Sequence, residues 1–152
     1  MNWTFSLFLL AAVPAQPQVD EMQLGTHYTN YHLAHRIAHQ TGKPMLIIFQ
    51  KGANSSSSEV SLVSVRKTRI RRELLGKYVV LIIDTTTPHG QVVYKAYKQP
   101  KLPHVVILGK KQEYQIFTTS EKLYGQRWTE ILKTYADGKL RSHFKDAAFC
   151  AT

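Results

Sequence analysis

The chain has 152 residues, 43% of them hydrophobic, and a formal net charge of +10 at pH 7. This length suits a single domain, and this hydrophobic content is normal for a globular protein and too high for a disordered one. The positive charge indicates nothing about the fold: a basic, soluble surface is its simplest meaning, a nucleic acid partner is not expected, and an acidic partner remains an alternative.

The first residues have the pattern of a secretory signal peptide. Trp3–Val13 is an apolar run that is too short to cross a bilayer comfortably, and the small residues Val13 and Ala15 have the spacing of a cleavage site. No Lys or Arg precedes the run, which departs from the usual pattern. We expect residues 1–15 to be removed near Ala15 and the protein to be exported, periplasmic or secreted, with no stable membrane span. Residues 16–27 are expected to form a linker.

The first folded elements are a helix and a buried strand. Apolar residues recur at helical spacing over Tyr28–Gln40, which predicts a helix with one buried face. Gly42 and Pro44 then end it, in the order that is usual for helix C-termini. Met45–Gln50 is a continuous apolar run, which predicts a strand that is covered on both faces of a central sheet.

A capping signal and a second strand follow. Ser56 and Glu59 have the spacing of a capping box, in which Ser caps a helix and Glu occupies its third position. A further short helix is expected over Thr68–Leu75. Tyr78–Asp84 is again apolar and predicts a second buried strand.

The remaining elements complete a mixed sheet. Helices are expected over Gln91–Lys98 and Gly125–Ala136, and strands over His104–Leu108 and Glu113–Thr118, with turn composition between the two strands. Strands separated by helices imply parallel neighbours, whereas a closing hairpin adds an antiparallel strand. The sequence therefore predicts an α/β three-layer sandwich with a central mixed four-stranded sheet and helices on both faces.

Three segments carry a resemblance to a known superfamily. Ala38–Pro44, followed by the apolar strand that ends at Phe49, is similar to the N-terminal part of periplasmic thioredoxin-like and disulfide-interchange domains. Tyr78–Asp84 looks like the second strand of these domains, and Tyr97–Pro103 looks like the segment that leads to their cis-proline. The order and spacing of the three segments together resemble the thioredoxin-like superfamily.

This resemblance implies a thioredoxin-like domain over residues 28–138 and a C-terminal tail over residues 139–152. It also implies a cis peptide bond between Leu102 and Pro103, facing the loop after the first strand. In the relatives, the groove beside this bond takes extended polypeptide through backbone hydrogen bonds.

The cysteine pair of the redox-active relatives is missing. Counting from Phe49, Cys-x-x-Cys would fall either on Asn54 and Ser57 or on Ser55 and Ser58, and neither choice contains sulfur. Dithiol chemistry needs one thiolate to attack and a second thiol to resolve, and a serine hydroxyl does neither. Dithiol oxidoreductase activity is therefore not expected.

The same resemblance suggests a binding groove in place of the redox site. The groove would accept a protein or an extended peptide, and an acidic partner would suit the positive charge of the chain. No catalytic residue, metal or cofactor is expected. An enzyme that pairs the serine loop with a histidine at a helix-end oxyanion site is the alternative. The groove would be lined by Ser55, Ser56, Ser57, Ser58, Leu102, Pro103 and His104.

The histidines of the first helix and the single cysteine need no special function to explain them. His32, His35 and His39 share one helical face, which is a spacing that metal sites use, but no carboxylate or cysteine completes a ligand set nearby. Solvent-facing histidines are the preferred interpretation. Cys150 is the single cysteine of the chain, so it forms no internal disulfide; a disulfide between two chains, or a redox role of its own, remains an alternative.

The densest positive run is a candidate polyanion patch. It lacks the interleaved aromatic residues that stack on bases, although contact with phosphates or an acidic partner would need none. A solvated helix face is the preferred interpretation. The patch would consist of Arg66, Lys67, Arg69, Arg71 and Arg72.

Overall fold

A four-stranded mixed sheet forms the centre of the protein. The computed structural model describes residues 27–52 and 65–141. The strand order is β2-β1-β3-β4; β1 pairs in parallel with β2 and antiparallel with β3, which pairs antiparallel with β4. The strands are β1 (Met45–Gln50), β2 (Val79–Asp84), β3 (His104–Leu108) and β4 (Gln115–Thr119).

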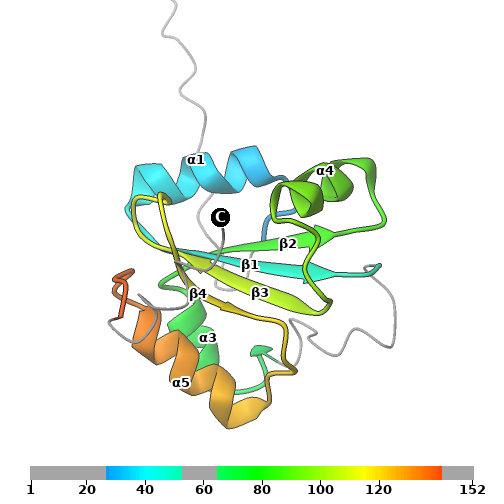
Figure 1. Cartoon of the computed structure of the whole chain (residues 1–152). Helices are drawn as coiled ribbons and strands as arrows, with labels where there is room; N and C mark the ends of the chain where they lie inside the picture. Colours follow the sequence, from blue (N-terminus) through cyan, green and yellow to red (C-terminus); the bar gives the residue numbers. More distant parts are fainter. Residues whose placement is uncertain (1–26, 53–64, 142–152) are drawn as a thin grey trace, which may run out of the picture.

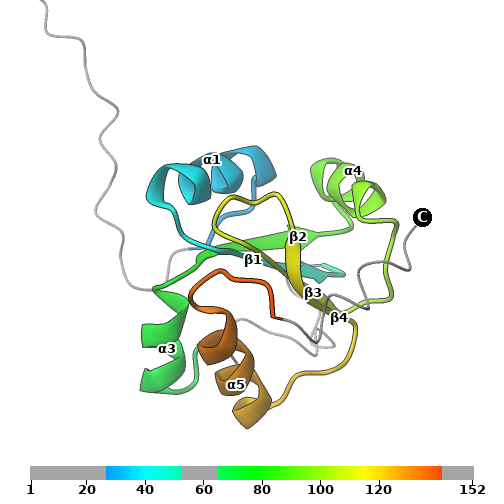
Figure 2. The ribbon, with the colours of Figure 1, turned by 60° about the vertical axis from the view of Figure 1, so that its left-hand side comes forward.

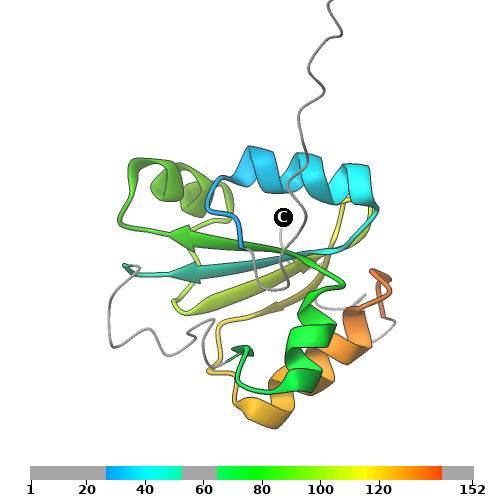
Figure 3. The same ribbon diagram turned by 180° about the vertical axis from the view of Figure 1, so that it is seen from behind.

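Helices cover both faces of this sheet. In Figures 1 and 2, α1 (Tyr31–Thr41) and α4 (Pro88–Ala96) lie above the sheet, and α3 (Arg69–Leu75) and α5 (Gly125–Tyr135) lie below it. The view from behind in Figure 3 shows the same two layers. The predicted three-layer α/β sandwich is confirmed.

The two layers of the core follow the alternation of side chains along the strands. Residues such as Leu46 and Ile48 of β1 pack toward Trp128 of α5, whereas Ile47 and Phe49 pack toward α1 and α4. Every β1 residue from Met45 to Phe49 is buried. The continuous apolar run therefore forms a strand that is covered on both faces, as the sequence predicts.

Helix starts differ from the sequence prediction because polar caps decide them. Helix α1 begins at Tyr31 rather than Tyr28, since the side chain of Asn30 accepts a hydrogen bond from the Leu33 backbone N–H at 3.0 Å. Tyr28 instead extends the sheet: its N–H donates to the Val80 carbonyl and its carbonyl accepts from the Ile82 N–H, both at 2.8 Å.

Helix α4 begins at Pro88 rather than Gln91, because Thr87 caps it and Pro88 occupies its first turn. Strand β4 is Gln115–Thr119 rather than Glu113–Thr118, beyond a turn in which Gln112 has a positive φ of 54°. Within the described ranges, no helix is long and apolar enough to cross a membrane. The signal segment 1–15, the Ser56 capping box and Cys150 lie outside those ranges.

Candidate functional site

The segment before β3 lies at one end of the central sheet. The Leu102–Pro103 peptide bond is cis, as the resemblance implies, and both residues are half-buried. The next residue, His104, is the register partner of Phe49 near the end of β1. Leu102 packs against the apolar cluster that lies under α1 and α4. The strand pairing thus brings Leu102, Pro103 and His104 to the end of β1, from which the predicted serine loop departs.

The backbone of this segment has unused hydrogen-bonding groups. Within the described residues, neither the N–H nor the C=O of Lys101 or Leu102 takes part in a hydrogen bond. Lys101 is exposed and Leu102 is only half-buried, so the segment lies at the surface just before β3. Such groups are the ones that pair with an extended peptide.

His104 is held from both of its ring nitrogens. Its Nδ1 forms a hydrogen bond with the Ser120 hydroxyl at 2.8 Å and its Nε2 with the Thr118 hydroxyl at 3.1 Å. The side chain is only 9% exposed and its ring lies 5.9 Å from the ring of Phe49. Burial lowers the pKa of His104 because it disfavours the charged imidazolium. His104 therefore ties the start of β3 to the end of β4, and its ring nitrogens are already occupied.

Aromatic side chains form the layer beneath this segment. The ring of Phe49 lies 5.0 Å from that of Tyr97 and 6.1 Å from that of Tyr94. Burial is the main cause that raises the pKa of Tyr97, and the neighbouring Tyr31 raises it further, so the Tyr97 hydroxyl stays protonated. These rings form a packed apolar layer against which Leu102 lies.

Asp84 fixes the start of the predicted serine loop. One carboxylate oxygen, Oδ1, accepts hydrogen bonds from the backbone N–H of Gly52 at 3.0 Å and of Thr86 at 2.8 Å. It also accepts from the Thr86 hydroxyl at 2.6 Å. The ends of β1 and β2 are therefore locked together where the chain leaves the sheet.

The predicted site residues have different outcomes. Leu102, Pro103 and His104 come together as described, whereas Ser55–Ser58 lie outside the described residues. Sequence reasoning assigned no role to Asp84, Thr118 or Ser120. The one available signal for the last two was the polar stretch at the end of the last strand, and only the β3–β4 register brings it to His104.

The basic run is not one solvated face. Lys67, Arg69 and Arg72 are exposed, and Arg69 forms an ion pair with Glu73 at 2.8 Å. Arg66 is half-buried and Arg71 is only 5% exposed, so the expectation that the whole run faces solvent is wrong. Arg71 packs at the contact between α3 and α5, with its Nε donating to the Thr68 hydroxyl at 3.0 Å.

The three histidines on one face of α1 also differ in their exposure to solvent. His32 and His39 are exposed, but His35 is half-buried and stacks on Tyr31 with ring centroids 5.9 Å apart. The Tyr31 backbone N–H donates to Nε2 of His89 on α4 at 3.1 Å. In the described part of the chain, no three metal-ligating residues gather in a group that could hold an ion.

The buried His104 gives a pH prediction. Since its pKa is lowered by folding, the unfolded chain takes up the proton at a higher pH than the folded protein does. The stability that the neutral ring contributes is complete above the unfolded pKa of about 6.5 and is lost as the pH falls below it. His104→Gln should lose about 1 kcal/mol at pH 8, because one amide cannot reach both hydroxyls. Urea unfolding should show less further loss between pH 8 and pH 5 in the variant; parallel losses would contradict this role.

The comparisons with known proteins agree on the fold alone. No family model and no curated protein sequence matches the chain. The structure is similar to a thioredoxin from Thermus thermophilus, with a TM-score of 0.59 and 18% identity over 72% of this chain and 86% of the thioredoxin. It is also similar to a disulphide isomerase from Xylella fastidiosa Temecula1, with a TM-score of 0.53 and 22% identity over 68% of this chain and 86% of the isomerase.

A third similar structure is a DsbH oxidoreductase, with a TM-score of 0.55 and 15% identity over 84% of this chain and 96% of that protein. At these identities the likeness establishes a thioredoxin-like fold and leaves the activity to be argued from the site.

Proposed function

We propose that this thioredoxin-like domain binds an extended segment of a partner polypeptide, or joins a larger assembly through one, without dithiol chemistry. The observation that carries the proposal is the backbone of Lys101 and Leu102, which makes no hydrogen bond with any other residue that the structure describes, on a segment held by the aromatic layer and by His104. A polypeptide that pairs with such a held segment gains main-chain hydrogen bonds at little cost in ordering.

The cysteine content supports a non-redox role. The chain contains one cysteine, Cys150, so it cannot form the internal dithiol that disulfide exchange uses. The apolar pattern of residues 1–15 supports export of the protein. The occupied ring nitrogens of His104 speak against its use as a base for a serine nucleophile.

The test combines binding and turnover. An unfolded polypeptide whose cysteines have been blocked by carboxymethylation should bind the full-length protein, equally with and without dithiothreitol. Cys150→Ser should bind it as the wild type does, and neither protein should reduce insulin disulfides. Insulin turnover that disappears in Cys150→Ser, or binding that requires Cys150, would overturn the proposal.

A further inference from the structure

Lysines dominate the connection that leads into the candidate binding segment. Lys95, Lys98 and Lys101 recur every third residue, and all three are exposed. We call residues 95–101 the lysine loop. The sequence contains no Asp or Glu anywhere over residues 85–112. The positive charges therefore have no acidic neighbour along this part of the chain.

The lysine loop has a fixed and unusual backbone. Lys98 and Gln99 both have positive φ angles, of 61° and 50°, a conformation that residues other than glycine seldom adopt. Three hydrogen bonds hold it: Lys98 N–H to the Lys95 carbonyl at 2.9 Å, Gln99 N–H to the Tyr94 carbonyl at 3.0 Å, and the Tyr94 hydroxyl to the Pro100 carbonyl at 2.6 Å. Because the backbone is already fixed, presenting the lysines to a partner requires little further ordering.

The charges of the loop are not neutralised within the described residues. None of the three lysines forms an ion pair there. At the same end of the sheet, the Oδ1 atom of Asp84 is occupied by Gly52 and Thr86. Glu121, beyond His104, is exposed and is followed directly by Lys122.

We propose that the lysine loop selects an acidic segment of the partner polypeptide, through Lys95, Lys98 and Lys101; this inference rests on the proposed function. The lysines lead directly into the backbone of Lys101 and Leu102, which has no hydrogen-bond partner among the described residues, so a peptide held there would carry its side chains past them. Carboxylates on that peptide gain Coulomb energy and steer the encounter.

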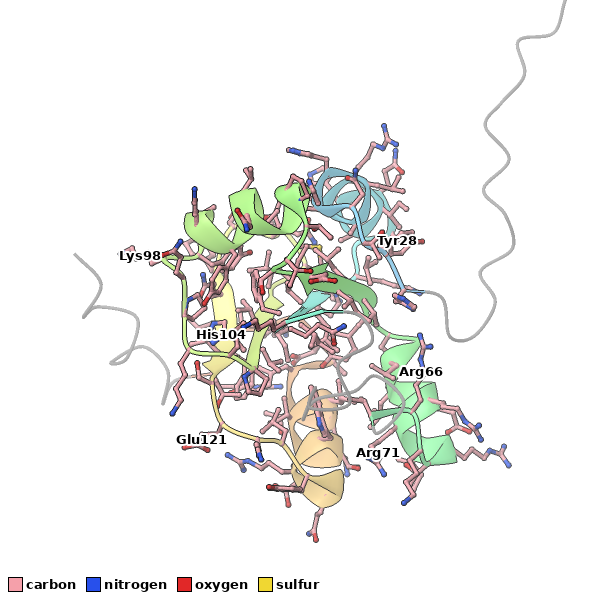
Figure 4. All side chains as sticks on the ribbon, turned by 90° about the vertical axis from the view of Figure 1, so that its right-hand side faces the viewer. Tyr28, Arg66, Arg71, Lys98, His104 and Glu121 are labelled. Carbon is pink, nitrogen blue, oxygen red and sulfur yellow. The ribbon has the colours of Figure 1, made fainter. Side chains whose placement is uncertain are left out.

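A polypeptide fits this surface better than a nucleic acid does. Tyr97 is the aromatic residue of the loop and Tyr94 directly precedes it; both are half-buried, so no exposed ring is offered there for base stacking. Figure 4 also shows Lys98, His104 and Glu121 on one side of the view and Arg66 and Arg71 on the other. The basic run near α3 is therefore a separate surface and not a continuation of the lysine loop.

The test uses three labelled peptides of equal length in which alternate residues are Glu, Gln or Lys. The Glu peptide should bind about tenfold more tightly than the Gln peptide, at about twofold for each of the three exposed charge pairs. The double variant Lys95→Gln/Lys98→Asn should reduce this tenfold preference to about twofold and leave binding of the Gln peptide unchanged. Asn is chosen because it tolerates a positive φ.

The matched control removes the same charge elsewhere. Lys110 and Lys111 are exposed and follow Leu108, at the far end of the five-residue strand β3, about 15 Å from His104. Lys110→Gln/Lys111→Gln should keep the tenfold preference. Equal weakening by both double variants would overturn the inference, since net charge alone would explain it.

Other outcomes separate this inference from the proposed function. If the Gln and Glu peptides bind equally well, the inference fails and polypeptide binding survives. If no peptide binds, the proposed function fails and the inference fails with it. Heparin binding that is lost in the Lys95/Lys98 variant, without peptide binding, would replace the acidic polypeptide by a polyanion.

Discussion

Replacing Gly90 with alanine is expected to cost about 3 kcal/mol or more of the free energy of unfolding. A Cβ at this position of α4 would lie 1.8 Å from the Asp84 carbonyl oxygen and 2.9 Å from the Thr87 hydroxyl oxygen. Because the nearer of these two atoms belongs to the backbone and cannot rotate away, α4 would have to move away from β2. Such a loss is a large fraction of the 5–15 kcal/mol typical of a domain. Urea unfolding would measure it.

Gly125→Ala is the matched control for this prediction. Gly125 also lies near the start of a helix, α5, but its added Cβ would find its nearest neighbour, the Arg71 guanidinium, at 3.8 Å. That is ordinary van der Waals contact, and alanine favours a helix, so stability should be unchanged or slightly higher. Equal losses at both positions would contradict the close approach of α4 to Asp84. The Asp84 carboxylate also accepts a hydrogen bond from the Gly52 N–H, so Gly90→Ala should also disturb the end of β1 beside the Leu102–His104 segment.

Arg71→Ala is expected to cost about 3 kcal/mol, although Arg71 belongs to a run that looks like a surface patch. The side chain is 5% exposed, donates to the Thr68 hydroxyl and reaches the side of Gly125, so it fills the contact between α3 and α5. Its removal leaves a cavity and unpaired polar groups. Urea unfolding of purified Arg71→Ala is the measurement.

Arg72→Ala provides the control, since it is one residue away on the same helix and exposed. It should change stability by less than about 0.5 kcal/mol. A similar small effect for Arg71→Ala would show that the arginine is not structural. Any test of polyanion binding by this run should therefore change Lys67, Arg69 and Arg72, which are exposed, and leave Arg71 in place.

The sequence predicts the sheet well because its strands are buried on both faces. Met45–Gln50 and His104–Leu108 have the predicted bounds, since a continuous apolar run fits few other environments. Helix starts were less predictable. Asn30 and Thr87 cap the chain at places where apolar spacing suggested a different first residue, and Tyr28 joins the sheet through its backbone, which has no sequence signature.

The site could be predicted only where it is local in sequence. The cis bond at Leu102–Pro103 followed from the resemblance. The partners of His104 depend on the register between β3 and β4, and the burial of Arg71 depends on the packing of α3 against α5. Neither relation can be read from spacing along the chain. The positive φ of Lys98 was equally hidden, because lysine rarely adopts it.

Backbone amide NMR tests the central claim most directly. The carboxymethylated unfolded polypeptide would be titrated into the full-length protein, and the amide signals would be followed residue by residue. We predict the largest shifts at Lys101, Leu102 and His104, with smaller ones at Lys98 and Gly52, whether or not dithiothreitol is present. Shifts confined to α3, or an unperturbed Lys101–His104 segment in a saturated complex, would contradict a polypeptide-binding role for this end of the sheet.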